Sequence, residues 1–149
     1  MNKKIFLLCV AFTIVFLSAC VTTPAKIDQD PGRYNGTLVK VRGEVEKIYK
    51  IPLTDISVFL LRDDEIAVPV VSLVEREEGG KVVVNGEVWA FPEEGMNAGS
   101  IEAVEAVEGF LVENDLVGKE RGRQVAALVL TAVQKLAAGL GEIWFIIEK

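Results

Sequence analysis

Residues 39–45, VKVRGEV, and residues 82–88, VVVNGEV, decide the fold, because both carry the string Val-x-Val-x-Gly-Glu-Val. In the first stretch, apolar residues or glycine alternate with charged residues, which is the pattern of a strand with one buried face. A glycine on the buried face of a strand is typical of a bulge or a tight coil, where a side chain would obstruct a neighbouring strand. Strands that bend in this way allow a small sheet to close on itself.

Three further strands are predicted around these two. Apolar residues alternate in residues 56–60 and again in residues 66–70, and the acidic run Asp63-Asp64-Glu65 forms a turn between them. Residues 142–148, EIWFIIE, are apolar enough for a buried fifth strand.

The segment between the fourth and fifth strands has a helical pattern over about residues 98–140. Ser100 is a plausible N-cap for a helix whose apolar residues between 101 and 111 share one face. A stronger helix, rich in Ala and Leu, is predicted from Gly122 or Arg123 to Ala138.

This order of elements resembles the OB-fold, a five-stranded Greek-key barrel. The resemblance covers residues 37–91 and rests on the shared glycine string, the short acidic turn and the brief connection before residue 82. Other small barrels, such as SH3-like ones, use similar glycines and remain an alternative. We therefore expect a mainly β, α+β domain over residues 37–149, in which an OB-like barrel carries a helical insertion before its last strand.

The first twenty residues, MNKKIFLLCVAFTIVFLSAC, have a cationic start and an apolar run too short to span a bilayer, as export signals do. Leu17, Ser18, Ala19 and Cys20 then match the lipobox, so the segment resembles the signal peptides of bacterial lipoproteins. The resemblance implies that residues 1–19 are cleaved off and that Cys20 is lipidated. We interpret residues 20–36 as the lipidated cysteine and a polar tether.

Lipidation implies an attachment to the membrane of the bacterial cell envelope. Two or more acyl chains, palmitate among them, give stable anchoring where a single chain does not. Val21 follows the cysteine in place of the Asp that retains enteric lipoproteins in the inner membrane. The resemblance therefore favours the periplasmic face of the outer membrane, or the outside of the plasma membrane in a host with one membrane.

Composition excludes several function classes for the mature chain. The net charge is −6, and it becomes −8 when Lys3 and Lys4 leave with the signal, so nucleic-acid binding is not expected. The chain has no histidine, and its two cysteines are Cys9 in the signal and the lipobox cysteine. Triads, common zinc hydrolase sites and disulfides are thus excluded, and no cofactor or metal is expected.

Three residues are candidate ligand contacts. Trp89 and Phe91 have the outward parity of the fourth strand, where aromatics suit a sugar or peptide, although we favour the alternative that the helical insertion covers them. Arg42, with Lys40 and Arg62, would form a basic spot where OB-folds bind oligonucleotides or oligosaccharides. The neighbouring glutamates favour a solvated mixed-charge surface there.

Two acidic groups invite a functional interpretation and are better explained by structure. Residues 63–65 lack the spacing of a calcium loop and are typical of a turn. Glu102, Glu105 and Glu108 recur every three residues, as in the solvated face of a helix.

These observations predict a non-catalytic, membrane-anchored binding or assembly module whose partner is an envelope protein or a glycan. The alternative is an adapter that docks on a larger envelope complex through its C-terminal helices, and it requires an uncovered apolar stripe on residues 123–138. A weaker alternative is a glycan-acting enzyme that uses carboxylates, which requires two acids in one pocket.

Overall fold

The computed structural model describes residues 21–90, 101–138 and 144–149. The lipobox residues 17–20 and the candidate contact Phe91 lie outside the described residues. The described strands are β1 (Val21–Thr22), β2 (Leu38–Lys50), β3 (Ser57–Arg62), β4 (Ala67–Ser72), β5 (Lys81–Ala90) and β6 (Trp144–Glu148). The described helices are α2 (Pro24–Asp28), α3 (Pro31–Tyr34), α4 (Ile101–Glu113) and α5 (Lys119–Ala137).

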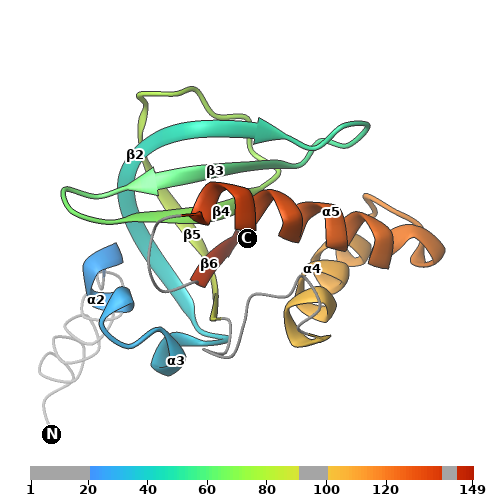
Figure 1. The fold of residues 1–149 in the computed structure, drawn as a ribbon, viewed down its shortest axis with the longest axis horizontal. Coiled ribbons are helices and arrows are strands. Elements are labelled where there is room, and N and C mark those ends of the chain that lie inside the picture. Colours follow the sequence, from blue (N-terminus) through green and yellow to red (C-terminus); the bar gives the residue numbers. More distant parts are fainter. Residues whose placement is uncertain (1–20, 91–100, 139–143) are drawn as a thin grey trace, which may run out of the picture.

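Five strands close into a barrel in the order β2-β3-β4-β6-β5, and β5 pairs again with β2 (Figure 1). Neighbouring strands of these five are antiparallel except for β4 and β6, which are parallel. The strand order is that of an OB-fold, with α4 and α5 inserted before the last strand. The predicted fold is therefore confirmed, and the SH3-like alternative does not have this order.

The two glycines of the repeated string lie where a neighbouring strand leaves no room for a side chain. A Cβ on Gly43 would lie 2.6 Å from the carbonyl oxygen of Arg62 on β3. A Cβ on Gly86 would lie 2.5 Å from the carbonyl oxygen of Ile147 on β6. Both distances are shorter than any carbon–oxygen contact that a side chain tolerates, so the two strands bend over their neighbours only with glycine at these positions.

The apolar residues form two cores, one inside the barrel and one between the barrel and the helices. On β6, Trp144 and Ile146 belong to the interior core, whereas Phe145 and Ile147 belong to the outer core with α4 and α5. This division explains why residues 144–148 are buried without alternation, while β2 alternates between buried and accessible positions.

Helices α4 and α5 pack on each other and on the outside of the barrel (Figure 1). The second helix begins at Lys119, a turn earlier than the sequence predicts, because Gly118 is the extended N-cap residue and Glu120 lies favourably in the first turn. In the part of the chain described here, no helix combines the length and the apolar character needed to cross a bilayer.

The prediction of a polar tether is wrong for residues 21–34, which fold onto the barrel. Val21 and Thr22 pair in parallel with β2, and the Thr23 side chain caps α2. Ile27 is fully buried in the interior core, and the indole Nε1 of Trp144 donates a 2.9 Å hydrogen bond to Asp28 Oδ1. The buried residues of this five-residue helix are Pro24 and Ile27, which are too few to establish a hydrophobic period, so its sequence resembles a linker.

Candidate functional site

The candidate site lies at a gap in the pairing of β2. On one edge of this strand, β1 pairs with Lys40 and Val41, and β3 begins to pair at Glu44. Arg42 and Gly43 lie between the two partners. This edge of β2 therefore has no described partner strand at Arg42 and Gly43, with β1 on one side of the gap and β3 on the other.

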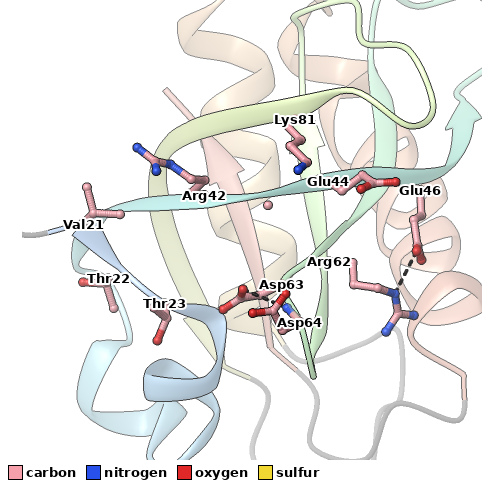
Figure 2. A pocket seen from close by; sticks show the side chains of 11 residues that line it. Val21, Thr22, Thr23, Arg42, Glu44, Glu46, Arg62, Asp63, Asp64 and Lys81 are labelled. Carbon is pink, nitrogen blue, oxygen red and sulfur yellow. Dashed lines mark hydrogen bonds and ion pairs between the residues drawn. The ribbon is translucent and has the colours of Figure 1, made fainter.

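A cleft of about 750 Å³ occupies this gap (Figure 2). Its walls come from β1 and the residue after it, from β2, from the β3–β4 turn and from the start of β5. The lining residues are Val21, Thr22, Thr23, Arg42, Gly43, Glu44, Glu46, Arg62, Asp63, Asp64 and Lys81.

The charges of the cleft are mixed and only partly paired. Arg62 Nε donates a 2.8 Å hydrogen bond to Glu46 Oε1, which neutralises one pair. Arg42 and Lys81 are exposed and form no ion pair with another described residue.

The carboxylates of the β3–β4 turn lie across the cleft from these two cations. Figure 2 shows Asp63 and Asp64 on the opposite side from Arg42 and Lys81. The backbone N–H of Asp64 donates a 2.8 Å hydrogen bond to Asp63 Oδ1, which fixes the turn and leaves the Asp64 carboxylate in solvent. The cleft therefore presents both cations and carboxylates to a ligand, and the exposed Glu44 lies opposite Lys81 on the paired strands β2 and β5.

The structure separates the predicted contacts. Arg42 and Arg62 line the cleft, whereas Lys40 lies just outside it on the same strand. Trp89 is half-buried and packs against the outer core, which contains residues of α4 and α5 as well as of the barrel. The mixed-charge interpretation of the region around Arg42 also agrees with the Arg62–Glu46 pair.

Sequence reasoning missed the part that Thr22, Thr23 and Lys81 play in the cleft, and assigned Asp63 and Asp64 only to a turn. Strand β1 is only two residues long, and each of its residues pairs in parallel with a residue of β2 nineteen positions further along the chain. No sequence period reports such a pairing. Glu44 of β2 pairs with both Arg62 and Lys81, so the β3–β4 turn and the start of β5 meet beside β2.

Two ion pairs lie on another part of the barrel. Arg76 Nη2 donates a 2.5 Å hydrogen bond to Glu148 Oε1, and the buried Ser72 hydroxyl donates to Glu148 Oε2. This network satisfies a buried carboxylate and is structural. At the surface, Lys50 Nζ lies 2.9 Å from Glu75 Oε1, and its hydrogen bond and charge hold the pKa of that carboxyl below the ordinary value of 4.5.

The geometry of the cleft suits binding better than acid–base catalysis. A general acid at neutral pH is a carboxylic acid held in a buried, apolar setting. Glu44 and Asp64 are instead exposed, and Glu46 is occupied by Arg62. Among the described residues, no three carboxylates gather closely enough to hold a metal ion.

Comparisons with protein-family models and with curated proteins find no match to this chain.

Proposed function

We propose that this chain is a lipid-anchored, non-catalytic binding or assembly module of the bacterial cell envelope. Cys20 carries the lipid, and the barrel lies outside the hydrocarbon core of the membrane. In a host with two membranes, the proposed location is the periplasmic face of the outer membrane. The proposed partner is another envelope component, a protein or a glycan.

The observation that carries this proposal is the junction between the lipobox and the barrel. The lipobox ends at Cys20, and the next residue, Val21, already belongs to strand β1. Cleavage before Cys20 would therefore leave β1 and its pairing with β2 intact, as a lipid-anchored barrel requires.

The open cleft supports a binding role over a catalytic one, for the reasons of exposure and pairing given above. The adapter alternative receives less support. It requires an uncovered apolar stripe on α5, but the apolar face of that helix is buried, and of its large apolar side chains Leu128 alone is exposed.

The proposal is tested by a pair of cysteine variants expressed in a bacterial host. Cys20→Ser removes the proposed lipid acceptor, and Cys9→Ser changes a cysteine within the proposed signal. We expect Cys20→Ser to accumulate as a precursor that incorporates no labelled fatty acid. The Cys9→Ser control should be processed, labelled and recovered with membranes like the parent chain.

If Cys20→Ser matures and incorporates fatty acid like the parent, the lipoprotein proposal fails. Recovery of partners from detergent-solubilised membranes then tests the binding role. We expect an envelope protein or glycan to be retained by the parent chain. A partner lost on Leu128→Asp and retained by the cleft variant Arg42→Gln would favour the adapter over the barrel.

A further inference from the structure

Four side chains beside the N-terminal junction form one surface, which we call the anchor face: Val21, Leu38, Lys40 and Arg42. Val21 pairs directly with Lys40, so the two side chains point to the same side of the sheet. Leu38 and Arg42 are two residues either way along β2 and share that side. All four are exposed, and the two apolar ones are 43% and 74% accessible.

The anchor face is held rigidly next to the proposed lipid. Val21 is one peptide bond from Cys20, and β1 is fixed by its pairing with β2. Beyond it, the Thr23 cap and the buried Ile27 lock α2 onto the barrel. No spacer separates the modified residue from the barrel, so an acyl chain at Cys20 brings the anchor face to the membrane surface.

The composition of this face suits the headgroup region of a bilayer. Exposed apolar side chains next to cations are the pattern of surfaces that lie at a membrane interface. Leu38 and Val21 would otherwise be large apolar groups left in water beside the attachment point.

The charges favour a headgroup that carries both signs. Arg42 and Lys81 lie on one side of the cleft, with Glu44 beside Lys81, and the carboxylates of Asp63 and Asp64 lie on the other side (Figure 2). An anionic headgroup would leave those carboxylates without a counter-charge. In addition, an anionic surface would repel the mature chain, whose net charge is −8. A zwitterionic headgroup offers phosphate to the cations and ammonium to the carboxylates.

We infer that the anchor face rests directly on a bilayer of zwitterionic phospholipid. Val21 and Leu38 enter the headgroup region, and Lys40 and Arg42 bind lipid phosphates. The carboxylates of the cleft bind the ammonium groups. This inference rests on the proposed lipid anchor. It assigns the cleft to lipid headgroups and leaves the proposed envelope partner to the rest of the surface. It also fixes the orientation, with the cleft toward the membrane and the β2–β3 turn away from it.

Two exposed leucines at opposite ends of β2 provide matched reporters. Leu38→Cys places a thiol on the anchor face, and Leu53→Cys places one in the β2–β3 turn, where the parent side chain is fully exposed. If the lipid blocks Cys20, each variant of the mature lipoprotein has one free thiol. Each is labelled with an environment-sensitive fluorophore and reconstituted into phosphatidylethanolamine–phosphatidylcholine vesicles.

We expect the label at residue 38 to be quenched by spin-labelled phospholipid and to be severalfold less accessible to iodide than the label at residue 53. In vesicles of phosphatidylglycerol alone, the protection at residue 38 should fall. Replacing Lys40 and Arg42 by Gln together should reduce it in the zwitterionic vesicles, while the label at residue 53 does not change.

Each contrary outcome has its own meaning. If the protein does not float with the vesicles, or if two thiols are labelled per chain, both the anchor and the inference fail. If the protein floats with the vesicles but iodide reaches residues 38 and 53 equally, the lipid anchor stands and the contact between the anchor face and the bilayer is overturned. Equal protection in both kinds of vesicle, or no effect of the double Gln variant, overturns the zwitterionic headgroup as the partner.

Discussion

Gly86→Ala tests whether the barrel closes by the close strand contact described above. The new Cβ would lie 2.5 Å from the carbonyl oxygen of Ile147, and the Cγ2 atom of Ile146 is nearer still. Strand β6 is paired on both sides, so its backbone cannot move away without disturbing two ladders. Overpacking of this kind costs about 1–3 kcal/mol, and the backbone contact puts Gly86→Ala at about 3 kcal/mol.

The assay is urea or thermal unfolding of the chain from Val21 onward, followed by the fluorescence of its buried and half-buried tryptophans, Trp144 and Trp89. A loss of about 3 kcal/mol lowers the melting temperature of a domain of this size by roughly 10 °C. Gly43→Ala should also destabilise, since its Cβ would lie 2.6 Å from the Arg62 carbonyl oxygen.

Gly109→Ala is the matched control, because the residue is inside α4 and no atom beyond the local helix backbone lies within 4 Å of its Cβ position. There alanine should stabilise the protein by up to about 1 kcal/mol through helix propensity. If Gly86→Ala is as stable as the parent, or gains stability as the control does, the proposed reason for the repeated glycine is refuted.

Three further predictions concern single side chains. Ile27→Ala should cost about 2–4 kcal/mol in the same unfolding assay, because the side chain is fully buried, and an unchanged stability would restore the tether interpretation. Leu53→Asn should stabilise by about 0.5–1 kcal/mol, because Leu53 has a φ of 63° and a fully exposed side chain, and a loss of stability would contradict that conformation. Lys50→Gln should raise the pKa of Glu75 toward its ordinary value in an NMR titration, and an unchanged pKa would contradict the ion pair. Folding lowers the pKa of Glu75, so the ion pair stabilises the protein at pH values above the ordinary pKa of this carboxyl. The stabilisation is lost as the pH falls through the lowered pKa.

The barrel strands were predictable from the sequence because each alternates or runs apolar over five or more residues. Residues 39–45 and 82–88 also carried the glycines that explain closure, since only a missing side chain allows the approach of Arg62 and Ile147. The order of the strands followed from the resemblance to the OB-fold, and the pairing of β4 with β6 completes it.

The N-terminal segment and the cleft were not predictable in the same way. Helix α2 has two buried residues, Pro24 and Ile27, and two positions are too few to establish a hydrophobic period. The cleft depends on the two-residue pairing of β1, which brings residues 21–23 beside the β3–β4 turn. Arg42 was found because it lies on a regular strand, whereas Lys81 was missed because nothing nearby in sequence connects it to that turn.

The most direct test of the account is the mass of the N-terminal peptide of the native protein extracted from bacterial membranes. The account predicts a peptide that begins at Cys20 and carries a diacylglyceryl group, with Val21 as its second residue. A peptide that retains residues 1–19, or one that begins at Cys20 without lipid, would contradict it.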